Sequence, residues 1–349
     1  MLPTVSIVIP AYNAEGTIAS VVSAVMQAAE AQHVLVVDPG SSDATAGIAR
    51  GLGAEVLQLE YRAGPAQSRN IGVENAESDI ILFIDSDCVP KTDVVRTVRE
   101  AFGANPELVS LTGSYDDDPP DRGFFSQYMN LRHHSTHQMA NRDNATFWAG
   151  LGAVRRTAFL QVGGFDAERY PEPQIEDIEL GLRLAPLGQM QLDPDLQVKH
   201  LKRWTFRSVV ETDIRCRAIP WSRLILEHGD LPNDLNLRSS QRLAGAIAPL
   251  VLLAVVTGPV AAVGLAYPQV FAGSLRAAVL VLAGSLLVVG FSLYLNAGLV
   301  RTFARIRGLP FALGGWLFQQ VHLTYSAVTF AVCSLLHRFR RRNGSRDSH

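Results

Sequence analysis

Short apolar runs alternate with longer segments of mixed composition over the first 110 residues of the chain. The runs predict β-strands rich in Val, Ile and Leu: Val5–Ile9, Val34–Val37, Val56–Leu59 and Ile80–Ile84. The segments between them predict helices, capped by Asn13 and by Ser42 or Asp43: Asn13 to about Glu30, Ser42 or Asp43 to Ala49, and Ala66–Ala76. Continuous apolar strands separated by helices indicate a parallel sheet covered on both faces, and hence an α/β domain.

The pattern becomes mixed beyond Val109. A strand is predicted at Phe147–Val154, where glycines let the backbone pass close to a neighbour, then a helix at Gln174–Leu184 and a strand at Met190–His200. From Arg203 to His228, apolar residues recur at helical spacing among five arginines. A basic amphipathic stretch just before apolar segments predicts helices that lie on an anionic lipid surface.

Two uncharged segments, Leu243–Tyr267 and Ala277–Val300, are long enough to span a bilayer. A third, Leu309–Leu336, is also uncharged but contains glycines, glutamines and a histidine. Arginines flank this third segment on both sides, and the positive-inside rule places both flanks in the cytoplasm. We therefore predict three membrane-embedded segments, the last of which either spans against the charge rule or folds back as a re-entrant or interfacial hairpin.

Four regions are predicted along the chain. They are an α/β domain at 1–202, interfacial amphipathic helices at 203–240, an α-helical transmembrane region with two to three embedded helices at 241–340, and a basic disordered tail at 341–349. The N-terminus has no basic region followed by a long apolar core. No signal peptide is therefore expected, and the first 240 residues should stay in the cytoplasm.

Charge and cysteine content exclude several classes of protein. A net charge of −2 on 349 residues gives no reason to expect nucleic-acid binding. The three scattered cysteines, Cys88, Cys216 and Cys333, form no Cys-x-x-Cys pair and predict packed, reduced thiols. The histidine cluster at 133–137 lacks a clear third ligand, so no metal site is predicted there.

Polar clusters follow three of the predicted strands. They are Pro10-Ala11-Tyr12-Asn13, Asp38-Pro39-Gly40-Ser41-Ser42-Asp43 and Asp85-Ser86-Asp87. Ligands of parallel α/β sheets bind beyond the carboxyl ends of the strands, so the clusters indicate one site. Asp85 and Asp87, at i and i+2, project to the same side of the chain, and their hard oxygens suit Mg²⁺ or Mn²⁺ bridging to a diphosphate. The alternative is a solvated turn, because D-x-D occurs often by chance.

Four motifs follow one another in the chain: VSIVIPAYNAE (Val5–Glu15), VVDPGSSDAT (Val36–Thr45), AQSRNIGVENAESDIILFIDSDCVP (Ala66–Pro90) and VGGFDAERYPEPQIEDIELGLRL (Val162–Leu184). In this order they resemble family-2 glycosyltransferases with the GT-A fold, of the membrane-anchored bacterial type. The resemblance covers roughly residues 4–230. It implies a Rossmann-like GT-A domain with a mostly parallel sheet, followed by the α-helical transmembrane region.

The resemblance also implies a nucleotide-sugar donor carried by UDP or GDP. The positions that match the family's donor side are Pro10, Tyr12, Asn13, Asp38, Arg69 and Asp85. Tyr12 would stack on the base, and the alternative is a packed tyrosine in a strand-end turn. Pro39 replaces the second of two adjacent acids in the family's second loop, which puts the reading of the base in doubt. Asp85 would contact the ribose or metal-bound water, and Asp87 would ligate the metal.

Asp177, next to Glu176, matches the family's general base. Inverting transfer needs one carboxylate that takes the acceptor hydroxyl proton as the oxygen attacks the anomeric carbon opposite the leaving diphosphate. The alternative is a helix ion pair, because Glu179 and Arg183 stand at i, i+4. The predicted buried face of this helix leaves Asp177 free to line a cleft.

Acceptor contacts are predicted at two places. Trp148, Gly150 and Gly152 would line the acceptor path, with core packing as the alternative. His200 ends a strand where many family members place a histidine, near the diphosphate or as a core residue. Arg217 and Trp221 lie in a run that loosely resembles the Arg-Trp motif of polysaccharide synthases, and they are candidates for contacting a lipid phosphate; snorkelling arginines are the alternative.

These features predict an inverting hexosyltransferase that uses Mg²⁺ or Mn²⁺. It would move a sugar from a UDP- or GDP-linked donor to a lipid-linked acceptor, either a polyprenyl phosphate or a glycolipid. The protein is expected in the bacterial inner membrane as a multi-pass protein in contact with membrane lipids, with its catalytic domain in the cytoplasm and a role in the cell envelope. The alternatives are a processive polysaccharide synthase, for which few embedded segments leave little room for a channel, and a catalytically silent scaffold subunit.

Overall fold

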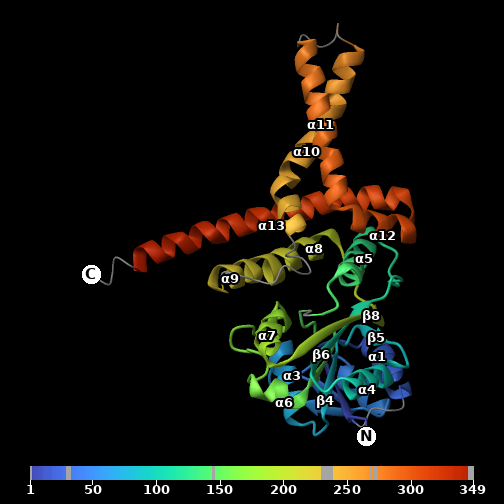
Figure 1. Ribbon diagram of the computed structural model, residues 1–349. Coiled ribbons are helices and arrows are strands. Elements are labelled where there is room, and N and C mark those ends of the chain that lie inside the picture. Colours follow the sequence, from blue (N-terminus) through green and yellow to red (C-terminus); the bar gives the residue numbers. More distant parts are fainter. Residues whose placement is uncertain are drawn as a thin grey trace. The chain divides into compact units, whose positions relative to one another are not determined.

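The structure of the protein is a computed structural model (Figure 1) that describes residues 2–28, 33–143, 146–228, 239–267, 269 and 274–344. The chain forms two compact units, Met1–Val209 and Val210–His349. The first contains all the described strands, and the second is helical. The division lies near residue 202, where the α/β domain is predicted to end.

The first unit is built on one sheet of 8 strands in the order β3-β2-β1-β4-β7-β6-β8-β5. The strands are β1 (Val5–Pro10), β2 (His33–Asp38), β3 (Glu55–Gln58), β4 (Ile80–Ile84), β5 (Cys88–Pro90), β6 (Leu108–Tyr115), β7 (Leu151–Arg155) and β8 (Gln189–His200). The strands β1 to β4 are parallel, as are β6 and β8. The strand β7 runs antiparallel between β4 and β6, and β5 runs antiparallel to β8. The predicted Rossmann-like GT-A sheet is confirmed.

Helices cover both faces of this sheet (Figure 1). They are α1 (Ile18–Gln27), α2 (Thr45–Gly51), α3 (Pro65–Glu74), α4 (Val94–Ala104), α5 (Phe124–Met139), α6 (Arg156–Gln161) and α7 (Glu176–Leu184), the last followed by a 3₁₀ turn at Ala185–Leu187. Ile7 enters the core that contains residues of α1 and α4. Its neighbour Val8 enters the core that contains residues of α3, α6 and α7. Successive side chains of a strand point to opposite faces, so the fully apolar β1 is buried on both sides.

The helix predicted from Asn13 begins later, and the prediction that Asn13 caps it is wrong. The helix α1 starts at Ile18 and receives no side-chain cap. Asn13 has a φ of 49°, and its Oδ1 accepts hydrogen bonds from the backbone N–H and the hydroxyl of Ser42 at 2.9 and 3.3 Å. Its side chain therefore binds the neighbouring loop instead of a helix end.

The second unit consists of helices, and α8 leads into it. They are α8 (Phe206–Thr212), a π-helix at Asp213–Ala218, α9 (Ile219–His228), α10 (Ser239–Ala266), α11 (Leu275–Leu295), α12 (Ala297–Arg307) and α13 (Leu309–Gly344). The helices α10 and α11 form a hairpin (Figure 1). Among the described residues these two helices are long and apolar enough to cross a membrane, each with a mean hydropathy of 2.3. Gly258 of α10 packs against Ser285 of α11, where a small residue allows close approach.

The helices α12 and α13 differ from what the sequence predicted. The apolar segment predicted at Ala277–Val300 is broken at Asn296, where α11 has ended and α12 begins. The helix α13 runs across the base of the α10–α11 hairpin (Figure 1). It continues to Gly344, into the segment predicted as a disordered tail. The end of that predicted tail, 345–349, lies outside the described residues.

Candidate active site

The loops after β1 and β2 are tied together at the carboxyl edge of the sheet. The hydroxyl of Ser41 accepts the backbone N–H of Asn13 at 2.9 Å, and Asn13 Oδ1 accepts that of Ser42 at 2.9 Å. Tyr12 is 42% exposed in this loop. The guanidinium of Arg62 lies 5.1 Å from the centre of the Tyr12 ring. The predicted base-stacking side chain is thus accessible and held beside a cation.

Asp38 ends β2 as a fully buried carboxylate. Its Oδ1 accepts the backbone N–H of Ser41 at 2.8 Å, whereas Oδ2 is buried and finds no hydrogen-bond partner in the part of the chain that the structure describes. Gly40 has a φ of 75°, a left-handed conformation that lets the chain turn just after Pro39. Pro10 ends the neighbouring strand β1. A buried acceptor without a donor is costly, so Asp38 Oδ2 is suited to a donor on a bound ligand.

Arg69 of α3 joins two carboxylates that are far apart in the sequence. The side chain is buried, and its two terminal nitrogens donate to Asp85 Oδ1 at 2.7 Å and to Glu176 Oε1 at 2.9 Å. Burial alone would lower the pKa of Arg69, but the charges of Asp85 and Glu176 raise it above its usual value. A permanently charged guanidinium therefore holds the D-x-D turn and the start of α7 together.

Asp177 lies next to this ion pair but is held by backbone groups. Its carboxylate accepts the N–H of Ala149 at 3.2 Å and that of Ile178 at 2.8 Å. Loss of water around the carboxylate, and then the charge of Glu176, raise the pKa of Asp177 to about 7, against the lowering effect of Arg69. A carboxylate with a pKa near 7 is a stronger base than an ordinary aspartate and still ionises near neutral pH.

The predicted ion pair of α7 forms without Asp177. Arg183 donates to both oxygens of Glu179 at 2.7 Å and to the backbone oxygen of Val162 at 2.6 Å. A guanidinium that grips a carboxylate with two nitrogens is fixed in place. Glu179 therefore has a structural partner within the helix, and the carboxylate of Asp177 is left for another role.

Asp87 and His200 meet where β4 and β8 end. Asp87 Oδ2 lies 3.3 Å from His200 Nε2. Asn130 Nδ2 donates to the backbone oxygen of Ser126, so Asn130 Oδ1 is the atom that lies 2.5 Å from His200 Nδ1. The amide oxygen only accepts, and Nδ1 therefore carries a proton. The lone pair of Nε2 then faces a carboxylate oxygen, an arrangement that needs a proton or a cation between the two atoms.

The chemistry of the neighbouring groups fits a divalent cation at this place. The ligand atoms of Asp87, Cys88 and His200 lie within 4.8 Å of one another. Burial and the nearby aspartates raise the pKa of the Cys88 thiol well above its usual value, so it is a neutral thiol and a poor ligand. One carboxylate and one imidazole remain. Asp85, the other predicted ligand, is bound to Arg69, and its contact with a metal stays a prediction.

Trp148 and Gly150 lie near the Asp87–His200 pair and the D-x-D turn. The ring of Tyr115 stacks on His200 at 4.4 Å and meets the edge of Trp148 at 4.7 Å. A Cβ added at Gly150 would collide with the Trp148 ring. The backbone oxygen of Gly150 accepts the N–H of Asp85 at 3.3 Å. Of the residues predicted to line the acceptor path, Gly150 therefore contacts Asp85, a residue predicted to bind the donor.

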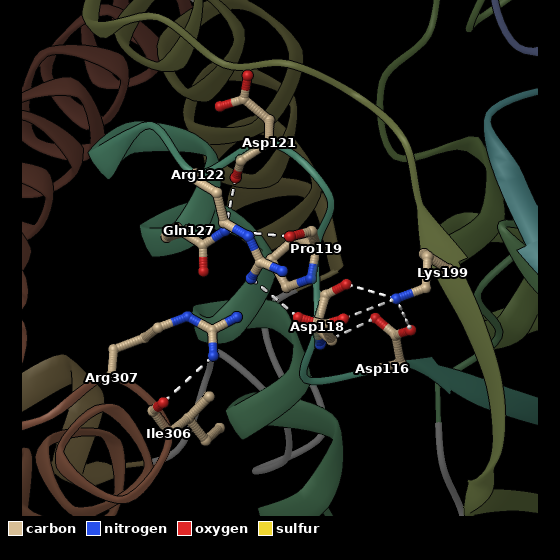
Figure 2. A network of polar contacts seen from close by, with 9 residues as sticks. All are labelled: Asp116, Asp118, Pro119, Asp121, Arg122, Gln127, Lys199, Ile306 and Arg307. Atoms are coloured by element: carbon tan, nitrogen blue, oxygen red, sulfur yellow. Dashed lines mark hydrogen bonds and ion pairs between the residues drawn. The ribbon is translucent and has the colours of Figure 1, made fainter.

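Sequence reasoning assigned no role to Tyr115, Asn130 or Lys199. Lys199 precedes His200, and its ammonium lies 3.1 Å from Asp116 Oδ2 and 3.3 Å from Asp118 Oδ2 (Figure 2). These contacts tie the end of β8 to the loop after β6. The signal that could have found this loop is its run of aspartates directly after a strand, the position of the other polar clusters.

Arg217 and Trp221, the other acceptor candidates, belong to the second unit. Arg217 pairs with Asp213 Oδ1 at 2.9 Å inside the π-helix. Trp221 is half-buried on α9. Their contact with a lipid phosphate stays a prediction.

Comparisons with known proteins identify the family of the N-terminal region. Residues 6–163 match the sequence model of glycosyl transferase family 2. Glycosyltransferase AglE of Haloferax volcanii is 35% identical over 117 residues, which are 31% of this chain and 38% of that protein. Glycosyltransferase GlyG of Streptococcus pneumoniae is 24% identical over 166 residues, 46% of this chain and 55% of that protein.

A solved structure extends the likeness to the fold of most of the chain. Mannosyltransferase PcManGT from Pyrobaculum calidifontis, in complex with GDP-Man and Mn²⁺, has a TM-score of 0.58 and 21% identity, and the match covers 95% of this chain and 88% of that one. The chain spans 38% and 55% of the lengths of the two curated relatives. The family match, the sheet topology and the ordered motifs lead to one conclusion: the N-terminal unit of this chain is a family 2 glycosyltransferase domain with the GT-A fold.

Proposed function

We propose that the protein is an inverting, metal-dependent hexosyltransferase that moves a sugar from a UDP- or GDP-linked donor to a lipid-linked acceptor at the cytoplasmic face of a membrane. The observation that supports it most is the carboxylate of Asp177. Its pKa of about 7 suits a general base, and it lies beside the Glu176–Arg69 ion pair that leads to Asp85 at the donor end of the sheet.

Asp177 takes the proton of the acceptor hydroxyl as that oxygen attacks the anomeric carbon. The backbone N–H groups of Ala149 and Ile178 keep its carboxylate in one orientation. Arg69 favours the ionised form, because its positive charge lowers the pKa that burial raises. One base on one face of the sugar, without a covalent intermediate, gives inversion of the anomeric carbon.

Asp38 and Tyr12 recognise the nucleobase in this proposal. Asp38 Oδ2 accepts an N–H of the base, which would supply the donor that this buried oxygen lacks among the described residues. The exposed ring of Tyr12 stacks on the base. Because Pro39 follows it, Asp38 has no adjacent acid with which to share this contact.

Mg²⁺ or Mn²⁺ would be held by Asp87 and His200, whose facing acceptor atoms lie 3.3 Å apart. When bound, such a cation neutralises the charge that develops on the leaving diphosphate. Asn130 and Tyr115 fix the imidazole, the first by its hydrogen bond to Nδ1 and the second by stacking. Hydrogen-bonded outer residues of this kind hold a ligand ready for its metal.

The proposed lipid-linked acceptor follows from the second unit. The helices α10 and α11 are long and apolar enough to hold the chain in a membrane. A catalytic domain tethered to a bilayer meets an acceptor in that bilayer at a high effective concentration. The basic residues of the π-helix and α9 suit the phosphate of such a lipid.

The test is transfer by the purified full chain in lipid vesicles. GDP-mannose and UDP-glucose are offered with Mn²⁺ and with polyprenyl phosphate or a glycolipid, and the anomeric configuration of the product is read by NMR. Asp177→Asn should lower kcat about 10²–10⁴-fold. Glu100→Gln, at an exposed acid on α4, is the matched control and should leave kcat unchanged.

Three results would count against parts of the proposal. If Asp177→Asn keeps full activity, Asp177 is not the general base. A product that keeps the donor's anomeric configuration excludes inversion. Transfer that survives chelation of divalent cations excludes the metal.

A further inference from the structure

Most of the exposed large apolar side chains of α13 form a stripe along one face of the helix, whereas Phe330, 40% exposed, lies on the other face. The members of the stripe are between 39% and 62% exposed: Leu309, Leu313, Leu317, Val328, Val332, Leu335 and Phe339. They are spaced by three, four or eleven residues, intervals that keep side chains on one face of an α-helix. The stripe is ~45 Å long at 1.5 Å per residue. A soluble protein rarely leaves such a surface uncovered.

Polar side chains in the first half of α13 fasten it to the foot of α11. The indole of Trp316 donates to Ser292 Oγ at 3.3 Å, and Ser292 Oγ donates to Gln320 Oε1 at 3.1 Å. Ser292 and Gln320 have no exposed surface. Asn296, at the break after α11, donates to the backbone oxygen of Ser292 at 2.9 Å. Separating these groups in an apolar medium would leave each without a partner, so α13 is held at this crossing.

A charged cluster fastens the middle of α13 to the π-helix. Asp213 is 1% exposed. Its Oδ2 lies 2.8 Å from His322 Nδ1 and accepts the hydroxyl of Tyr325 at 2.6 Å, while Oδ1 pairs with Arg217 at 2.9 Å. His322 stands near the centre of the apolar segment Leu309–Leu336. If that segment spanned a bilayer, the carboxylate of Asp213 and the guanidinium of Arg217 would be drawn toward its apolar middle, where charges are costly.

The geometry points to α13 lying in the plane of a membrane, with the Leu309–Phe339 stripe on an anionic lipid surface, and not to a third span. The inference rests on the membrane attachment within the proposed function. It agrees with the course of α13 across the base of the α10–α11 hairpin (Figure 1). Arg301 and Arg305 precede α13, and Arg338 lies near its end. An in-plane helix keeps all these arginines at the headgroups of one leaflet, as the positive-inside rule requires.

A lipid surface fits the stripe better than a protein partner. The helices α10 and α11 of the same unit also expose large apolar side chains, such as Leu253 and Leu287. The arginines beside α13 complement anionic headgroups, and an amphipathic helix of this kind buries its apolar face about 5–10 Å into the headgroup boundary. The partner is therefore the cytoplasmic leaflet in which the hairpin stands.

Spin-label depth measurements test this inference. The full chain, with Cys216 and Cys333 replaced by serine, is placed in vesicles of phosphatidylglycerol and phosphatidylcholine and labelled at Leu313→Cys, Val328→Cys or Leu335→Cys. Contact with oxygen and with a water-soluble nickel chelate gives the depth of each label. We expect one shallow depth for all three labels, about 5–10 Å. A spanning helix would separate the first and last labels by about 33 Å, and labels that pass through the middle of the bilayer overturn the inference.

A control and a second measurement make the result independent of labelling. Ser326→Cys, on the side of α13 opposite to the stripe, should collide less with oxygen than Val328→Cys; equal collision of the two sites contradicts the orientation. A protease-sensitive tag after His349 should be cleaved in inverted vesicles and protected in intact spheroplasts, because two spans and an in-plane helix return the C-terminus to the cytoplasm. Cleavage in spheroplasts overturns the inference.

These readouts separate the inference from the proposed function. Release of the whole protein by alkaline carbonate would refute membrane attachment and the inference with it. A retained protein whose α13 spans refutes the inference alone. Loss of glycosyl transfer with an unchanged depth profile refutes the proposed function and leaves the inference standing.

Discussion

Removing the charge of Asp177 should change how stability depends on pH. The pKa of this carboxyl is raised from 3.8 to about 7, so the folded protein holds the proton more tightly than the unfolded chain does. The stability that this proton contributes is fully present below about pH 4 and is lost as pH rises through about 7. At pH 8 the folded protein therefore carries an ionised carboxylate where its surroundings disfavour one, and Asp177→Asn relieves this cost.

The magnitude follows from the pKa shift. A rise of the pKa from 3.8 to about 7 corresponds to about 4 kcal/mol at pH 8 and about 2 kcal/mol at pH 5. An asparagine amide can accept from only one of the N–H groups of Ala149 and Ile178 and turns its own donors toward the other, which costs about 1–3 kcal/mol at every pH. The free energy of unfolding of Asp177→Asn, relative to that of the wild type, should therefore rise by about 2–3 kcal/mol from pH 5 to pH 8.

Thermal unfolding of the full chain at pH 5, 6, 7 and 8 is the assay. For a domain of this size, 2–3 kcal/mol corresponds to a change of about 4–12 °C in the Tm difference between Asp177→Asn and wild type. The control Glu100→Gln should differ from the wild type by the same Tm at every pH. If the Tm of Asp177→Asn relative to the wild type stays constant or falls with rising pH, the raised pKa of Asp177 is refuted. The assignment of Asp177 as the general base then loses its support.

Three further outcomes are expected. The kcat/KM of the wild type should rise with pH and level off above about 7, because Asp177 must first lose its proton; a flat profile between pH 5.5 and 8.5 would contradict this. Tyr115→Leu removes the ring stacked on His200 and should weaken Mn²⁺ binding about tenfold by calorimetry without donor, whereas Tyr115→Phe keeps the ring and should bind normally; equal affinities would exclude a positioning role. Gly150→Ala forces a Cβ into the Trp148 ring and should raise the acceptor KM while donor binding, measured by fluorescence, stays the same; an unchanged acceptor KM would place the acceptor elsewhere.

Local features of the fold could be predicted from the sequence because they depend on neighbouring residues. The strand Ile80–Ile84 was predicted with the bounds that the structure has, since an apolar run ended by an aspartate leaves little ambiguity. The Arg69–Glu176 ion pair joins residues 107 positions apart, and no local pattern encodes such a meeting. The antiparallel insertion of β7 between β4 and β6 is equally non-local.

The sequence predicted individual residues of the candidate site but not which of them contact one another. Motif order pointed to Asp87 and Asp177, whereas the pairing of Asp87 with His200 depends on β5 running beside β8. The expected cap at Asn13 failed because the side chain had two possible donors, a helix end and a neighbouring loop, and only the folded sheet brings the second one near. Hydropathy alone could not decide whether the segment Leu309–Leu336 spans a bilayer. His322 at the middle of this segment argues against a span only once its charged partner, Asp213, is known from the structure.

The order of the strands has a consequence for synthesis. Among the described elements, the last strand, β8, ends at His200, and α10, the first helix long and apolar enough to cross a membrane, begins at Ser239. At about 5–20 residues per second, roughly 2–8 s of translation separate the two. The described strands and the imidazole that faces Asp87 have therefore been made before the ribosome synthesises α10. The family 2 glycosyltransferase domain can therefore begin to fold on the ribosome before the apolar helices of the second unit have been made.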